Sequence, residues 1–359
     1  QLVRFNMRSL VSRRWIHSVR THPPMPNRSP AVLVCQPLLF NRPGAYRDIL
    51  EAAGFEVRFP RNGGCVLTEA QLESELDGVL ATIASTEPYT ISILKRAANL
   101  RVISRTGVGY DSIDVGAATG QGIAVACTPG TNHEAVAEHT FALLLAVAKC
   151  IVSGHREVSQ GGFRRKPTWS LRGKTMGLVG LGRIGRAVAR RAAAFDMRVI
   201  AYDPFLSAPP EDMRDVELTT LEDLLARSDV ISLHAGVTEN THRLIRRETL
   251  AKMKQGVVLL NTARGSLVNE TDLLESLQSE KVAAAGLDVF ECEPPAGSPL
   301  LGLANVVLSP HLAGIDEQAF LDSATMAAET IVELFQGRWP VERIVNMAQL
   351  PQPWKWSHE

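Results

Sequence analysis

Residues 176–185 read MGLVGLGRIG, and this stretch decides the fold. An apolar strand pattern over residues 176–179 leads into the pattern G-x-G-x-x-G, formed by Gly180, Gly182 and Gly185, and a helical pattern follows. The first glycine permits a tight turn, the second lets backbone N–H groups approach a pyrophosphate, and the third lets helix and strand pack closely. The N-terminus of the helix favours the phosphate anion. The stretch therefore predicts a dinucleotide-binding strand–turn–helix unit.

An acidic residue follows at the distance that such a unit requires. A second strand pattern, residues 199–202, ends in Asp203, close to the spacing of about 20 residues expected after the glycines. A carboxylate there accepts hydrogen bonds from both ribose hydroxyls and repels a 2′-phosphate, which favours NAD over NADP. The alternative is a glycine-rich turn beside an unrelated surface aspartate.

Strand and helix patterns alternate along the chain after residue 30. This alternation is typical of parallel sheets with helices on both faces. We therefore expect an α/β protein with two doubly wound parallel sheets and a cleft between the domains. The expected strands are residues 31–35, 55–59, 78–85, 101–104 and 122–127 in the first half, and 176–179, 199–202, 230–234, 257–260, 283–289 and 306–308 in the second.

Composition and charge exclude several classes of function. Hydrophobic residues make up 45% of the 359 residues, and 38 basic residues balance 38 acidic ones. This balance gives no electrostatic reason to expect nucleic acid or a membrane surface as a partner. The longest apolar run, residues 141–148, is far shorter than the ~20 residues of a membrane span. The five cysteines show no metal-ligand spacing and predict no metal site, and they favour a reducing compartment, the cytoplasm.

Residues 1–29 differ from the rest. They contain arginines and serines but no acidic residue, as mitochondrial transit peptides do. If they are such a peptide, the mitochondrial matrix replaces the cytoplasm as the expected location. The alternative is a start codon further downstream, at Met7 or Met25. In both cases we expect this leader to lie outside the fold.

A long helix is expected over residues 134–150, and its centre, residues 141–148, is apolar almost all round. A helix of this kind must be buried, and another subunit is one way to bury it, so the sequence predicts a homodimer. His139 lies within this helix, and we interpret it as structural because nothing nearby offers a partner for catalysis. Residues 153–170 are polar and predict a linker.

Three polar residues follow strand patterns in the second half. Arg264 follows residues 259–263, Glu293 comes shortly after residues 286–290, and His311 follows residues 306–310. The carboxyl ends of strands in a doubly wound sheet line the ligand crevice, so all three could reach one bound molecule. Taken singly, each has an ordinary alternative as a surface arginine, a loop cap or a turn histidine.

Several longer motifs lie along the chain: RTGVGYDSID at 105–114, EAVAEH at 134–139, LRGKT at 171–175, GLVGLGRIG at 177–185, NTARG at 261–265, LDVF with EPP within 287–295, and SPH at 309–311. With these motifs the chain resembles the D-isomer-specific 2-hydroxyacid dehydrogenases over about residues 78–316. Residues 202–204, YDP, look most like the phosphoglycerate dehydrogenase branch of that family.

The resemblance implies the catalytic roles. His311 is the acid/base that exchanges a proton with the substrate oxygen, and Glu293 pairs with it and favours its protonated form. Arg264 binds the substrate carboxylate, a task suited to a planar bidentate donor. The turn at Val108 and Gly109, together with Ser85, contacts the same substrate.

The resemblance also implies the cofactor, NAD, and the domains. The substrate domain, flavodoxin-like, is expected at residues 30–128 plus 315–345, the NAD-binding Rossmann domain at 129–314, and a tail at 346–359. Asp288 is expected to hold the nicotinamide carboxamide. The complete expected set of cofactor contacts is Gly180, Gly182, Arg183, Ile184, Gly185, Asp203, His234, Thr262, Asp288 and Gly314.

One departure affects the substrate. Phosphoglycerate dehydrogenases tend to carry an arginine just before Ser85, where this chain has Ala84. Losing a cation opposite a phosphate dianion makes the phosphorylated substrate doubtful. We therefore expect hydride transfer between NAD(H) and a small D-2-hydroxy or 2-keto acid, most like D-3-phosphoglycerate dehydrogenase. The alternatives are a hydroxypyruvate/glyoxylate reductase and, from another class, an NAD(H)-sensing protein similar to corepressors of this fold.

Overall fold

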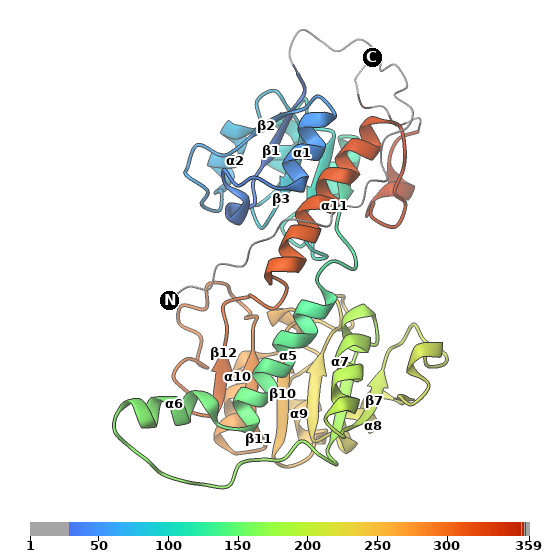
Figure 1. Ribbon diagram of the computed structural model, residues 1–359. Helices are drawn as coiled ribbons and strands as arrows, with labels where there is room; N and C mark the ends of the chain where they lie inside the picture. The colour runs from blue at the N-terminus through green and yellow to red at the C-terminus, as the bar shows by residue number, and fades with distance from the viewer. Residues whose placement is uncertain (1–28, 353, 355, 357–359) are drawn as a thin grey trace, which may run out of the picture.

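The computed structural model describes residues 29–352, 354 and 356. Within these residues the chain forms two α/β domains, drawn one above the other in Figure 1. Each domain has one parallel sheet with helices on both faces, so the prediction of two doubly wound parallel-sheet domains is confirmed. The predicted leader lies outside the described residues, apart from Ser29.

The first domain contains a five-stranded parallel sheet in the order β2-β1-β3-β4-β5, the flavodoxin-like order. Apolar residues on both faces of the sheet are buried, as in parallel sheets generally. Helices α1 (Ala45–Ala52) and α11 (Glu317–Phe335) cover one face, and α2 (Glu69–Glu75), α3 (Ile91–Arg96) and α4 (Val115–Gly120) cover the other. The strands are β1 (Ala31–Val34), β2 (Glu56–Arg58), β3 (Val79–Ala84), β4 (Val102–Arg105) and β5 (Ala124–Ala126).

The second domain contains a seven-stranded parallel sheet in the order β12-β11-β10-β9-β6-β7-β8. Helices α5 (His133–Ala148) and α7 (Arg183–Ala194) pack on one face, and α8 (Leu221–Arg227), α9 (Arg247–Lys252) and α10 (Glu270–Gln278) on the other. The strands are β6 (Thr175–Val179), β7 (Arg198–Tyr202), β8 (Glu217–Leu218), β9 (Val230–Leu233), β10 (Val257–Asn261), β11 (Val282–Leu287) and β12 (Val306–Leu308).

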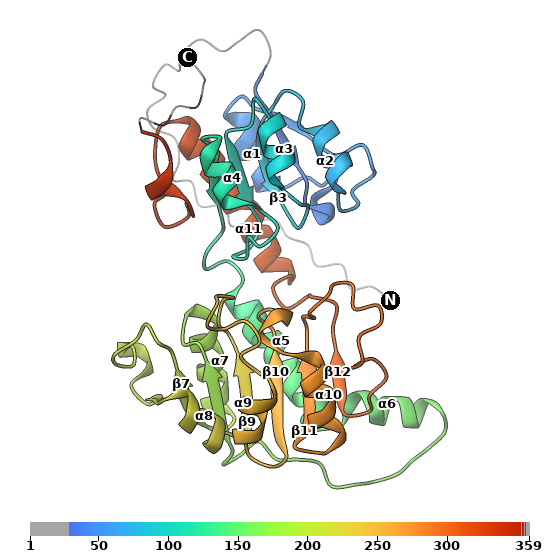
Figure 2. The same cartoon turned by 180° about the vertical axis from the view of Figure 1, so that it is seen from behind.

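The chain crosses between the domains twice, as Figures 1 and 2 show. The first crossing joins β5 to α5, and the second joins β12 to α11. The second ends at Asp316, whose carboxylate accepts a hydrogen bond from the Ala319 N–H at 2.7 Å and so caps α11. The expected domain boundaries fall within these crossings and stay predictions. Both crossings lie at the edge where the two sheets' strands end, so the loops that carry the predicted site face each other.

Two elements differ from the sequence-based expectation. Residues 153–159, expected as part of a linker, belong to the helix α6 (Ile151–Ser159), and β8 is an additional edge strand. β8 has only two residues, too few for a periodic pattern. No residue of α6 is buried against the described part of the chain, and Ile151 and Val158 on it are exposed. Because α6 packs against no core of the described residues, its sequence lacks the link between apolar positions and burial on which the prediction of a helix depends. Figure 1 shows α6 extending away from the second domain.

The apolar centre of α5 is covered by its own chain. Phe141, Leu143, Leu144 and Ala148 are buried against the second sheet and α7. The burial of residues 141–148 consequently gives no argument for a second subunit, contrary to the reasoning from sequence. The neighbouring helix α6 does carry exposed apolar side chains, Ile151, Val152 and Val158.

Among the described helices, none is by itself long and apolar enough to cross a membrane. Helices α5 and α6 meet the length and hydropathy criterion only as a pair, bent by 57° at the break between them.

Candidate active site

The glycine turn leaves open space at the N-terminus of α7. Gly180 has a φ of 98°, and a side chain there would collide with the carbonyl of His234. Gly185 packs closely against the backbone of Gly180. At Gly182 no atom of the described residues lies within 4 Å of the position that a Cβ would take. Because the first N–H groups of a helix have no intrahelical partner, this space fits the pyrophosphate of a dinucleotide.

Asp203 lies directly beside this turn. Its carboxylate accepts hydrogen bonds from the N–H of Leu181 at 2.9 Å and from the N–H of Phe205 at 3.0 Å. These bonds fix the carboxylate at the end of β7 next to the glycines. The remaining lone pairs are available to ribose hydroxyls, as NAD binding requires.

The other predicted cofactor residues lie around the same strand ends. Arg183 and Ile184 form the first turn of α7, and the Arg183 side chain approaches Gly130 in the first crossing. Thr262 follows β10, and its hydroxyl bonds to that of Thr140 on α5 at 3.0 Å. A side chain at Gly314 would contact the amide of Asn132. These residues connect the cofactor region with both crossings.

His234 follows β9, and its Nε2 atom is 2.9 Å from the hydroxyl of Ser232. Burial lowers the pKa of His234 to about 3, so the ring is neutral at pH 7. Its Nδ1 atom is buried and has no hydrogen-bond partner among the described residues. An unpaired buried polar atom beside the glycine turn is consistent with a ligand-binding role.

His311 and Glu293 form a pair. His311 Nδ1 lies 2.7 Å from Glu293 Oε2, and Glu293 Oε1 accepts a hydrogen bond from the Phe290 N–H at 3.1 Å. Partial burial raises the pKa of Glu293, but the hydrogen bond and charge of His311 outweigh this and hold it below its ordinary value. The His311 side chain is 45% exposed. The carboxylate thus orients the ring through Nδ1 and leaves Nε2 for a substrate oxygen.

Arg264 reaches from the second domain to the first. Its Nε donates to Asp111 Oδ2 at 2.8 Å, and its Nη1 donates to the carbonyl of Ala263 at 2.6 Å. The guanidinium lies so close over Gly109 that a Cβ there would collide with it. Arg264 and the predicted substrate turn are therefore in contact. A side chain at residue 109 would push the guanidinium out of this position.

The three loops that carry Arg264, Glu293 and His311 follow the neighbouring strands β10, β11 and β12. Gly265 packs against the backbone of Phe290, where a Cβ would collide, and the His311 N–H donates to the carbonyl of Asp288 at 2.9 Å. The second sheet thus brings these loops together at one edge, facing the turn after β4.

The other predicted substrate residues lie at the ends of β3 and β4. Val108 is exposed beside Gly109. The N–H of Ser85 donates to both carboxylate oxygens of Glu87, at 3.0 and 3.1 Å. Glu87 is fully buried, and burial raises its pKa although its hydrogen bonds act in the opposite direction. A buried carboxylate therefore supports the Ser85 loop.

Arg105 is a residue that our sequence reasoning missed. It ends β4 directly opposite Ala84 of β3, and its guanidinium lies against Gly107. Burial and the nearby charge of Arg264 lower its pKa to about 10, so it stays cationic at pH 7. It forms no ion pair with any described residue within 4 Å. As the first residue of motif 105–114, at a strand end, it carried a signal that could have identified it.

The interpretation of His139 as lacking a nearby partner is wrong. His139 Nε2 lies 2.8 Å from the hydroxyl of Ser309 and 3.4 Å from Asp288 Oδ1. The contact joins α5 to the loop after β12, which are 170 residues apart in sequence. Sequence proximity could not reveal it.

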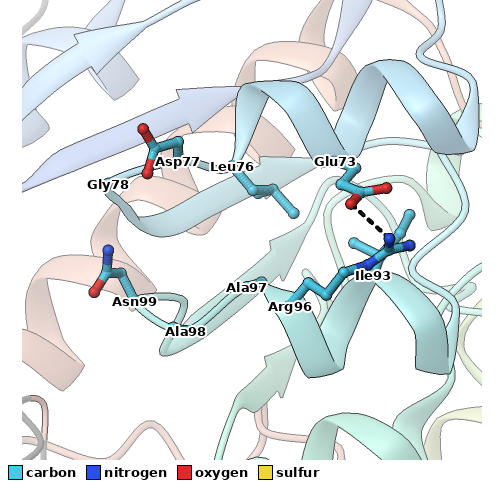
Figure 3. A pocket seen from close by; sticks show the side chains of 9 residues that line it. All are labelled: Glu73, Leu76, Asp77, Gly78, Ile93, Arg96, Ala97, Ala98 and Asn99. Atoms are coloured by element: carbon cyan, nitrogen blue, oxygen red, sulfur yellow. Dashed lines mark ion pairs between the residues drawn. The ribbon is translucent and has the colours of Figure 1, made fainter.

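Figure 3 shows a surface pocket elsewhere in the first domain. It lies between α2 and α3, where an ion pair joins Glu73 and Arg96 at 2.9 Å. Its other residues, such as Gly78 and Asn99, precede β3 and β4, at the amino ends of the strands. The pocket is therefore on the opposite edge of the sheet from the candidate site. The described residues contain no group of three or more His, Cys, Asp or Glu side chains that could hold a metal ion.

Comparison with known proteins agrees with this geometry. Residues 141–313 match the family model of the D-isomer specific 2-hydroxyacid dehydrogenase NAD-binding domain. A hydroxypyruvate reductase from Thermotoga maritima is 45% identical over 66% of this chain and 78% of the relative. The TT0316 protein of Thermus thermophilus superposes with a TM-score of 0.79 at 39% identity, over 88% of this chain and 99% of that one. The chain belongs to the D-isomer specific 2-hydroxyacid dehydrogenase family and contains its NAD-binding domain.

A D-3-phosphoglycerate dehydrogenase from Archaeoglobus fulgidus is 45% identical over 72% of this chain. The match covers 49% of that relative, so the chain spans about half of the relative's length. This likeness agrees with the branch expected from residues 202–204.

Proposed function

We propose that the chain is an NAD-dependent oxidoreductase that interconverts a D-2-hydroxy acid and its 2-keto acid. The observation that carries this proposal is the His311–Glu293 pair at 2.7 Å, at the same strand edge as Arg264, which contacts the substrate turn at Gly109. A proton donor, its orienting carboxylate and a carboxylate-binding guanidinium are the groups that carbonyl reduction needs from a protein.

The residues act as follows. Arg264 and the N–H groups of the Val108–Gly109 turn bind the substrate carboxylate and orient the carbonyl. His311 donates a proton from Nε2 to the carbonyl oxygen, and Glu293 stabilises the charged ring before the transfer. NADH, which the glycine turn at Gly182 and the Asp203 carboxylate would hold, would supply the hydride and its two electrons for reduction of the carbonyl carbon. Because Nε and Nη1 of Arg264 already donate to Asp111 and Ala263, we expect a substrate carboxylate that binds through two hydrogen bonds to displace Asp111 from the guanidinium.

For the substrate, we propose phosphohydroxypyruvate in the direction of reduction, as in D-3-phosphoglycerate dehydrogenases. Arg105 supports this, because it pairs with Ala84 in the sheet and its guanidinium, which lies against Gly107, is a cation at the end of the neighbouring strand. Hydroxypyruvate is the second candidate, since Ala84 is uncharged and buried and the neighbouring Glu87 carboxylate opposes a dianion.

The test is NADH oxidation with phosphohydroxypyruvate, hydroxypyruvate, glyoxylate and pyruvate, using His311→Ala as the control. We expect turnover that the control lacks, with phosphohydroxypyruvate preferred. Tight NADH binding without turnover of any of the four acids would favour the sensor alternative instead.

The homodimer is a further part of this proposal. Ile151, Val152 and Val158 on α6 and Phe163 after it are exposed, with Phe163 at 76%, and a second copy would bury them. Sedimentation of wild type and of Val158→Lys tests this: we expect a dimer that the substitution weakens. A monomeric wild type would contradict it.

For location, we propose the cytoplasm, or the mitochondrial matrix if residues 1–29 act as a transit peptide. Fluorescent fusions of the chain with and without residues 1–29 would distinguish the two. Mitochondrial signal that disappears with the truncation supports the matrix.

A further inference from the structure

Asp288 is the point where α5 meets the loop that carries His311. Its side chain is fully buried. Its carboxylate accepts hydrogen bonds from the Ser309 hydroxyl at 2.6 Å, the Leu312 N–H at 2.9 Å and the Ala313 N–H at 2.8 Å. With its backbone carbonyl accepting from His311, Asp288 holds the loop on both sides of the acid/base.

This fixation matters because His311 has an unusual backbone. Its φ is 53°, in the left-handed region that non-glycine residues adopt rarely and at a cost in free energy. The surrounding hydrogen bonds must hold this conformation. If they weaken, the loop can relax and the ring can leave Glu293.

A buried carboxylate needs hydrogen-bond donors around it, since an unpaired one is strongly destabilising. His139 supports this set of donors from α5, with Nε2 2.8 Å from Ser309 Oγ and 3.4 Å from Asp288 Oδ1. Burial raises the pKa of Asp288, but the hydrogen bonds from His139, Ser309 and the loop outweigh this and keep it ionised. The His139 side chain is 24% exposed, and nothing in the reaction described above uses it.

We propose that His139 is a positioning residue that acts through Ser309 and Asp288 to hold His311 against Glu293 for proton transfer. This inference rests on the proposed function for its kinetic consequence. It predicts that loss of His139 affects the proton-transfer step more than substrate binding, because Arg264 and the Gly109 turn belong to other loops.

The test compares His139→Leu, which removes the polar contact, with His139→Gln, whose amide Nε2 can still donate to Ser309. His242→Leu is the matched control, because His242 is exposed and outside the site. For His139→Leu we expect kcat to fall about tenfold or more with the KM for the keto acid within twofold of wild type. His139→Gln should recover kcat to within about threefold, and the control should match wild type.

A second readout does not need turnover. Diethyl pyrocarbonate modification of His311, mapped by mass spectrometry, should be several-fold faster in His139→Leu because the ring is no longer held, with His242 as the internal reference. If His139→Leu does not fold, Ser309→Ala takes its place and should raise the His311 rate in the same direction.

The outcomes separate the two proposals. Faster His311 modification in an otherwise inactive protein would support the positioning role and contradict the proposed activity. Unchanged His311 modification and unchanged kcat in the variants would overturn the positioning role. It would also be overturned if kcat and KM changed together without rescue by glutamine, since that indicates a general structural effect.

Discussion

The loops at the carboxyl ends of the two sheets are held in different ways. In the second domain, Asp288 fixes the loop around His311 through its carboxylate and its carbonyl, and Glu293 fixes the ring. In the first domain, the turn at Gly109 is shaped by a guanidinium that arrives from the other domain. The groups that act on the reacting carbonyl are therefore preorganised within one domain. The groups that recognise the rest of the substrate depend on the approach of the two domains.

Removing the acid/base should have the largest effect. His311→Asn keeps a residue that tolerates the left-handed backbone at this position. It removes the proton donor, so kcat should fall by about 10²–10⁴-fold. Stopped-flow NADH oxidation measures this, and equal melting temperatures would show that the fold is intact. Activity within tenfold of wild type would mean that another group donates the proton.

Weakening the contact that Arg264 makes between the domains should have the next largest effect. Arg264→Lys keeps the charge but loses the planar pair of donors over Gly109, so kcat/KM should fall by roughly 10²-fold, mostly through KM. Steady-state kinetics over a range of keto acid concentrations checks this. A fall in kcat alone would indicate that Arg264 does not bind the substrate in the ground state.

Arg105 tests how the first domain recognises the distal group of the substrate. Arg105→Met should lower kcat/KM for phosphohydroxypyruvate by about tenfold or more, because it removes a cation beside the substrate's distal group. Hydroxypyruvate should be affected by less than about threefold. Parallel assays of both substrates give the ratio. Equal losses for both would assign Arg105 to the common carboxylate or to folding.

The structure also shows which parts of the site could be predicted from the sequence alone. The glycine turn, Asp203, His311 and Glu293 were predictable because short motifs at strand ends identify them. Arg105 ends a strand and opens motif 105–114, so it could have been identified in the same way, although only the fold shows that it lies near Arg264. His139 could not, because it meets Ser309 across 170 residues. α6 was missed because its apolar side chains face away from its own chain. Local sequence patterns therefore identify the chemical groups, while tertiary packing decides which residues contact and position them.

The last prediction concerns stability and pH rather than catalysis. His234 has a folded-state pKa of about 3, below its ordinary value of 6.5. Between these values the unfolded chain binds the additional proton, so the free energy of unfolding falls as pH falls from 6.5 towards 3. The slope is at most about 1.4 kcal/mol per pH unit.

Urea unfolding of the cofactor-free protein between pH 7 and pH 4 checks this. His234→Gln should flatten the slope, and His242→Gln, at an exposed position, should leave it unchanged. The same slope in all three proteins would show that His234 is not the group responsible.

The central claim is that groups from both domains converge on one keto acid at the open face of the bound dinucleotide. A crystal structure with NADH and oxamate, an unreactive analogue of a 2-keto acid, tests it most directly. We predict that Arg264 leaves Asp111 to bind the oxamate carboxylate beside Gly109, while His311 Nε2 comes within hydrogen-bond distance of the amide oxygen and Nδ1 stays on Glu293. Oxamate bound away from His311, with Arg264 still on Asp111, would contradict the claim.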